Sequence, residues 1–175
     1  NLVNEFSDFA RMPKPIFKKN ELNKIIKDSI NLMKTNDKDI DINFASEKVY
    51  FVNSDIEQLN RVFINLFKNS IESLKEKHEK MGNFQKKIDV EIQLINDYIN
   101  IIVKDNGTGF ANNDLGILSK PYFTTKKEGS GLGLSIVEKI LNDHNGFIEF
   151  ISQKEGAKIK ILLPKYVNWN FDNRR

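Results

Sequence analysis

Apolar side chains recur every three or four residues in several stretches of the chain, the spacing of helices that bury one face. The longest predicted helix covers residues 54–80, and it starts where Ser54 and Glu57 have the spacing of a capping box. Shorter helices are predicted over residues 20–34 and 134–144. The expected core side chains of the long helix are Leu59, Val62, Phe63, Leu66 and Phe67.

Alternation of apolar and polar residues elsewhere predicts strands, joined as three hairpins. Their strands are expected at residues 40–44 with 49–52, 88–94 with 98–103, and 147–151 with 157–163. A further short strand is predicted at residues 16–18. The pattern therefore mixes strands and helices in a chain of 175 residues, enough for one domain with its own core.

Composition excludes several classes of protein. There is no cysteine and there are only two histidines, so neither disulfides nor a structural zinc site is expected. The net charge of +3 is small beside 27 basic residues, and no basic stripe with aromatics points to nucleic acid. No apolar run reaches membrane-spanning length. Because the chain begins with Asn1, we expect it to be a piece of a longer protein.

Two glycine clusters flank a connecting segment and together predict a nucleotide pocket. The β-branched residues 99–103 lead to Asp105, whose carboxylate would accept a hydrogen bond from an exocyclic amine such as that of adenine. The second cluster opens an apolar helix, where free N–H groups favour phosphate. The glycines are Gly107 and Gly109 in the first cluster, and Gly129, Gly131 and Gly133 in the second. Either cluster alone would more often be an ordinary loop, and it is their order and spacing that favour the pocket.

The long predicted helix carries a polar face beside its core stripe. Asn65, Asn69 and Glu72 follow one another at i, i+4 and i+7. A solvated face would explain them, but asparagine is a poor residue for a helix interior. The alternative, favoured by the glycine clusters downstream, is that the amide oxygens help to hold Mg²⁺ against phosphates.

Four segments together resemble the ATP-binding catalytic domain of sensor histidine kinases, in the wider family that includes gyrase, HSP90 and MutL ATPases. Residues 65–72 are similar to the N box, 105–109 to the first glycine box, 121–126 to the F box and 129–134 to the second glycine box. The resemblance covers residues 16–163. It implies an α+β fold, a two-layer α/β sandwich with a mixed sheet packed on helices, which agrees with the predicted elements.

The resemblance also implies roles for individual residues. Asn69 would be the principal ligand of Mg²⁺ with Asn65 assisting, and Asp105 would accept the adenine amine. Residues 106–130 would form a lid over ATP. The remaining expected ATP contacts are Gly107 and Gly109 at the base, Phe123 as lid anchor, Thr124, Thr125 and the catalytic candidate Lys126 near the γ-phosphate, and Gly129, Gly131, Leu132, Gly133 and Leu134 around the phosphates.

Domain limits and partners follow from the same resemblance. Residues 1–13 resemble the end of a dimerisation helix in NtrY-like kinases, residues 14–165 the catalytic domain, and residues 166–175 form a tail. No histidine fits the phosphoacceptor: His78 is expected to be an exposed helix-end residue, and His144 to meet the dipole of its helix. The implied partners are ATP, the dimerisation domain of the same protein and a response regulator. The domain would face the cytoplasm of a parent protein anchored in the bacterial inner membrane.

Two other functions stay open. An ATPase similar to gyrase would carry a Glu at position 65 to activate water, and Asn65 cannot act as that base. A non-catalytic, nucleotide-gated interaction module would keep the same binding residues without transferring phosphate.

Overall fold

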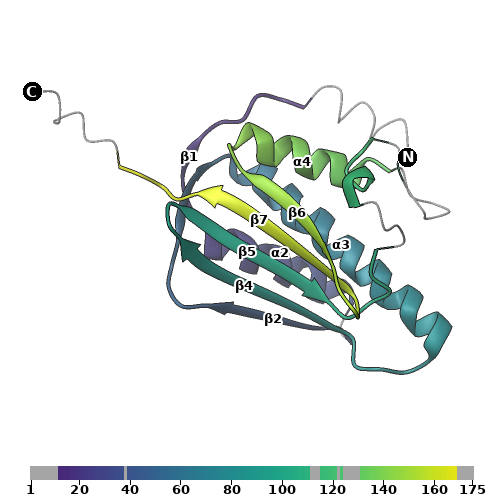
Figure 1. The fold of residues 1–175 in the computed structure, drawn as a ribbon. Helices are drawn as coiled ribbons and strands as arrows, with labels where there is room; N and C mark the ends of the chain where they lie inside the picture. The colour runs from purple at the N-terminus through teal and green to yellow at the C-terminus, as the bar shows by residue number, and fades with distance from the viewer. Residues whose placement is uncertain (1–11, 38, 111–114, 122, 124–130, 169–175) are drawn as a thin grey trace, which may run out of the picture.

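The computed structural model describes residues 12–37, 39–110, 115–121, 123 and 131–168, and Figure 1 shows a sheet with helices packed against it. Among these residues, five strands form a mixed sheet in the order β2-β4-β5-β7-β6. They are β2 (Asp41–Ser46), β4 (Lys87–Ile95), β5 (Tyr98–Asp105), β6 (Phe147–Ser152) and β7 (Ala157–Pro164). Only the pairing of β2 with β4 is parallel; the other three pairings of this sheet are antiparallel.

Helices of the described residues cover one face of this sheet (Figure 1). They are α2 (Leu22–Asn36), α3 (Ile56–Met81) and α4 (Gly133–Asp143). Alternate residues of the strands are buried against them, as Ile88, Val90 and Ile92 on β4 show. This arrangement confirms the predicted α+β sandwich. A 3-10 turn, η1 (Leu115–Ile117), lies in the part of the chain between β5 and α4.

The first predicted hairpin is wrong. Strand β3 (Phe51–Ser54) does not pair with β2 but runs antiparallel to β1 (Lys18–Glu21) as a separate ribbon. The cause is Asn23, a buried side chain of α2 that binds the connection between the two strands. Its amide donates to Ser46 Oγ at 2.9 Å and accepts from Tyr50 N–H at 2.8 Å. The other two predicted hairpins are confirmed.

Helix α3 begins one residue later than the capping box predicted. Asp55 is the cap, and its carboxylate accepts from the N–H groups of Glu57 and Gln58. Ser54 Oγ accepts instead from the Asn20 amide on β1. The helix ends at Met81, close to the predicted end.

His144 joins the C-terminal end of α4 to the start of α3. Its Nδ1 donates to Ile140 O at 2.7 Å, and its Nε2 accepts from Asp55 N–H at 3.0 Å. Burial lowers the pKa of His144, although the Ile140 carbonyl and nearby Asp55 and Asp143 oppose that shift. The residue is thus a neutral connector, and the expected favourable meeting of a charged histidine with the helix dipole is outweighed by burial.

A pH dependence of stability follows from this neutral histidine. The folded pKa lies below the unfolded one, so the unfolded chain binds more protons, and stability is lost as pH falls through the ordinary histidine range. The slope from this group is at most about 1.4 kcal/mol per pH unit. Urea denaturation between pH 7.5 and 5 should show a shallower slope in His144→Gln than in the wild type. Equal slopes in the two proteins would contradict this account of His144.

No helix among the described residues is long and apolar enough to cross a bilayer. The predicted limits at residues 1–13 and 166–175 fall largely outside the described residues and stay predictions.

Candidate nucleotide-binding site

The structure brings three of the four predicted motifs together. The loop after β5 meets the middle of α3, where Thr108 N–H donates to Ser73 Oγ at 2.9 Å. The N-terminus of α4 meets the same helix about two turns earlier. A Cβ added to Gly133 would lie 3.2 Å from Asn65 Oδ1. Thr108 and Gly133, which lie about 25 residues apart in the sequence, therefore border one region of α3.

Asp105 lies at the end of β5 with its carboxylate buried. Its Oδ1 accepts from Gly107 N–H at 3.0 Å and from Ala157 N–H at 3.2 Å, and its Oδ2 accepts from Ser70 Oγ at 2.9 Å. Burial raises the pKa of Asp105, while these three hydrogen bonds and the charge of Lys77 partly offset the increase. The structure thus holds a desolvated carboxylate in a fixed orientation.

Close packing explains why glycines occupy the first loop, and the sequence alone did not reveal this. A Cβ on Gly107 would lie 2.3 Å from Ser73 Oγ, because α3 passes directly behind the loop. Gly109 has a φ of +77°, and its Cβ would lie 2.9 Å from the carbonyl oxygen of Gly156. Gly156, in the turn between β6 and β7, would place a Cβ 1.8 Å from Asp105 O. The Asp105 loop is therefore clamped between α3 and that turn.

The polar face of α3 points its first asparagine toward α4. Asn65 Nδ2 donates to Arg61 O at 2.8 Å, which leaves Oδ1 directed at Gly133. Asn69 and Glu72 are half-buried further along the same face. At the start of α4, Leu132 is fully buried and Leu134 packs partly on the core. The preceding Gly131 has a φ of +69°, a conformation that favours glycine.

Part of the predicted site lies outside the described residues: Thr124, Thr125, Lys126 and Gly129. Phe123, the predicted anchor, is half-buried, and its N–H donates to Lys120 O at 3.1 Å. Among the described residues, no group of three His, Cys, Asp or Glu is placed to hold a metal ion.

Two residues of the site escaped the sequence analysis. Ser70 interrupts the apolar stripe of α3 between Leu66 and Leu74, and a polar residue in such a stripe was a readable signal. Lys77 donates to Asn106 O at 2.7 Å and pairs with Glu155 at 2.6 Å. It joins the Asp105 loop to the β6–β7 turn, a long-range contact that no local pattern could reveal.

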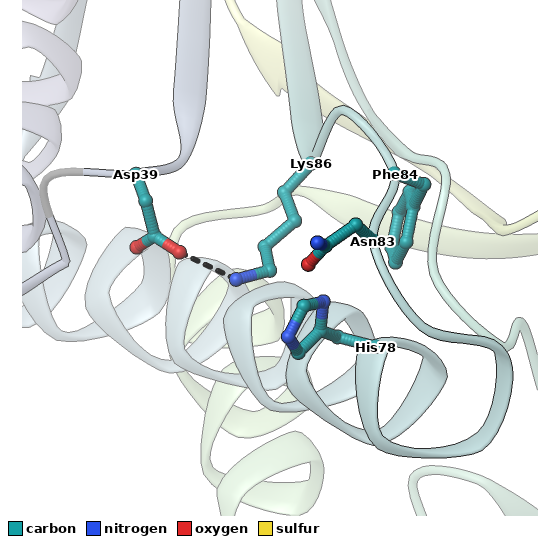
Figure 2. A pocket seen from close by; sticks show the side chains of 5 residues that line it. All are labelled: Asp39, His78, Asn83, Phe84 and Lys86. Carbon is teal, nitrogen blue, oxygen red and sulfur yellow. Dashed lines mark hydrogen bonds and ion pairs between the residues drawn. The ribbon is translucent and has the colours of Figure 1, made fainter.

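His78 does not have the exposed position that the sequence suggested. It is half-buried in a hollow of about 470 Å³ at the end of α3, with Lys86 reaching toward Asp39 across the same hollow (Figure 2). His78 Nδ1 is buried with no hydrogen-bond partner among the described residues. The other lining residues are Asn83 and Phe84, so this hollow lies apart from Asp105 and Asn65.

Comparison with known proteins decides the family. The model of the family described as histidine kinase-, DNA gyrase B- and HSP90-like ATPase matches residues 54–167. The chain belongs to this ATPase family. The match spans α3, the Asp105 loop and the start of α4, so the family is shown by the same segments that form the candidate site.

Relatives of this ATPase domain are sensor histidine kinases. The putative NtrY-like sensor histidine kinase of Rickettsia conorii is 38% identical over 163 residues, covering 92% of this chain and 26% of the relative. The catalytic domain of histidine kinase ThkA has a TM-score of 0.74 at 27% identity, covering 86% of this chain and 96% of that one. Full-length ShkA, solved in complex with AMPPNP, has a TM-score of 0.80 at 19% identity, covering 95% of this chain and 36% of that one.

These likenesses confirm the predicted resemblance to the catalytic domain of a sensor histidine kinase. The chain spans about a quarter of the length of the curated relatives it matches first. ThkA has also been solved in complex with a response regulator protein, TrrA, a structure that matches this chain at 24% identity with a TM-score of 0.73, covering 94% of this chain and 46% of that one.

Proposed function

We propose that the chain binds Mg·ATP and transfers the γ-phosphoryl group to a histidine on a dimerisation domain of its own protein. A response regulator would then receive the group on an aspartate. The observation that carries the proposal is the meeting of the Asp105 loop, the Asn65 face of α3 and the start of α4 in a member of this ATPase family. The neighbour solved with AMPPNP and the neighbour solved with a response regulator support it.

The base would bind at Asp105. Its buried, oriented carboxylate accepts hydrogen bonds and suits the 6-amino group of adenine. Phosphates would bind at the start of α4 (Gly133–Asp143), where the dipole of a helix favours negative charge. Gly131, Leu132, Gly133 and Leu134 would provide this contact, with Gly129, Phe123, Thr124, Thr125 and Lys126 completing it.

The residues present fit a magnesium ion. Asn65 Oδ1 is an uncharged oxygen held at the start of α4, and hard cations take such oxygens together with phosphate and water. Asn69, one turn further on, would be the principal ligand. The ion would neutralise phosphate charge, and the domain would contribute by positioning ATP. During transfer the bond from the γ-phosphorus to the bridging oxygen breaks, a bond to a histidine nitrogen forms, and ADP leaves.

Two alternatives would use the same pocket. ATP hydrolysis needs a base for water, and the amide of Asn65 is not one. An interaction module would bind the nucleotide and transfer nothing.

A transfer assay separates these functions. The chain, supplied with a dimerisation domain from its full-length protein and γ-labelled ATP, should label a histidine in an acid-labile, alkali-stable form. Tight ATP binding without labelling of the dimerisation domain would favour the interaction module. Rapid release of free phosphate would favour the ATPase.

Asn69→Ala should reduce magnesium-supported transfer by at least about 10-fold, the loss seen when even an outer partner of a bound metal is removed. Asn60→Ala makes the same change on α3 near α2, where Asn60 lies 3.4 Å from Ser29 Oγ, and serves as the control. Transfer rates are compared over a range of Mg²⁺ concentrations. A normal metal dependence in Asn69→Ala would contradict its role as ligand.

A further inference from the structure

Ser70 is a polar residue in the middle of an apolar helix face. It is 3% exposed, and Leu66 and Leu74, on either side of it in the stripe, are fully buried. A hydroxyl buried there costs free energy unless it forms a hydrogen bond. Its Oγ lies 2.9 Å from Asp105 Oδ2. The hydroxyl is therefore committed to the carboxylate of the candidate site.

The two oxygens of Asp105 differ in how much acceptor capacity they keep. A carboxylate oxygen accepts about two hydrogen bonds. Oδ1 already accepts two, from the backbone N–H groups of Gly107 and Ala157. Among the described residues, Ser70 is the donor to Oδ2, and it has a single proton. The acceptor position that remains for a ligand is therefore the second lone pair of Oδ2.

We propose that Ser70 is a positioning residue that reserves this lone pair of Asp105 for a 6-amino purine, and so sets the selectivity for adenine over 6-oxo purines. The proposal rests on the proposed function and goes beyond it by naming the group that orients the base-reading carboxylate. A 6-amino group donates a hydrogen bond to that lone pair. A 6-oxo group would place an acceptor opposite that lone pair, so no hydrogen bond would form and binding of the 6-oxo purine would be disfavoured.

The chemistry of a buried carboxyl strengthens the case. Burial raises the pKa of Asp105, and the Ser70 hydrogen bond is one of the contacts that opposes this. Without the hydroxyl, Asp105 takes up a proton more readily. A protonated carboxyl donates a hydrogen bond, which a 6-oxo purine accepts. Loss of Ser70 should therefore weaken adenine binding and relax selectivity, most clearly at lower pH.

The test compares the binding of ADP and inosine diphosphate by calorimetry at pH 8 and pH 6. The two nucleotides differ in the 6-substituent and in the proton that the 6-oxo purine carries on N1. Wild type should favour ADP. In Ser70→Ala, ADP affinity should fall about 10-fold, the effect of one hydrogen bond to a charged group, while inosine diphosphate affinity stays or rises. Ser70→Cys, which fills the same space with a poor donor, should behave alike.

Ser73→Ala provides the matched control. Ser73 lies one turn further along α3 and binds Thr108 of the same loop, but not Asp105. Its loss should leave the ratio of the two affinities unchanged, because it does not select the base.

An unchanged ratio in Ser70→Ala or Ser70→Cys, or an equal loss of both nucleotides, would overturn the role of Ser70 and leave the proposed function standing. Wild-type protein that binds neither nucleotide would overturn both. A ratio that falls in the Ser70 variants but not in Ser73→Ala supports the proposal.

Discussion

Replacing Asp105 by Asn is expected to weaken ATP binding by about 10- to 100-fold without unfolding the domain. The Asn oxygen can accept from Gly107 and Ala157 N–H, as Asp105 Oδ1 does. Its NH₂ group then occupies the place of Oδ2 and faces the adenine amine with a donor instead of an acceptor. Losing a hydrogen bond to a charged group costs about 1.5–3 kcal/mol, which corresponds to the expected loss of affinity.

The same variant should be at least as stable as wild type. Because burial raises the pKa of Asp105, its charge lowers the stability of the folded state at neutral pH, and a neutral amide removes that cost. Affinity for a fluorescent ATP analogue and the urea midpoint are measured on the same samples. Unchanged affinity would remove Asp105 from the site, and a large loss of stability would contradict the account of its hydrogen bonds.

Gly156→Ala should have the largest effect on stability. Its added Cβ would lie 1.8 Å from Asp105 O and 2.8 Å from Asn106 Cα, and its φ of +70° is unfavourable for alanine. Neither contact is with a flexible side chain, so the β6–β7 turn or the Asp105 loop must move. Left-handed strain and overpacking together predict a loss of about 3 kcal/mol or more. Nucleotide affinity should fall as well, because the displaced backbone carries Asp105.

Gly82→Ala is the matched control for this prediction. Gly82 also has a positive φ, of +81°, but a Cβ there has nothing within 4 Å. It should lose stability through backbone strain alone, about 1–3 kcal/mol, and keep its nucleotide affinity. The two variants are compared by urea denaturation and then by nucleotide titration at a temperature where both are folded. Wild-type affinity in folded Gly156→Ala would show that the turn does not set the position of Asp105.

Much of this fold could be predicted from periodicity because most elements bury a regular face. The apolar stripe of α3 and the alternation in β4, β5 and β7 are local signals, and each was confirmed. The separation of β2 from β3, which pair with β4 and β1, could not be predicted in this way. It depends on the Asn23 amide, which reaches the connection between these strands from a helix more than 20 residues away.

The candidate site shows the same division between local and long-range information. Asp105 could be singled out because it ends a recognisable strand, and Asn65 because it lies on a recognisable helix. The reasons for Gly107 and Gly156 lie in contacts with Ser73 and Asp105 O, which only the packed structure reveals. Ser70 is an intermediate case. Its interruption of the apolar stripe of α3 was visible in the sequence, but its hydrogen bond to Asp105 was not.

The most direct test of the central claim is a calorimetric titration of the wild-type chain with a non-hydrolysable ATP analogue, with and without Mg²⁺. We expect saturable binding to one site per chain, strengthened by Mg²⁺ and competed by ADP. Absence of binding under both conditions would contradict the claim that the Asp105 loop, α3 and the start of α4 form a nucleotide site.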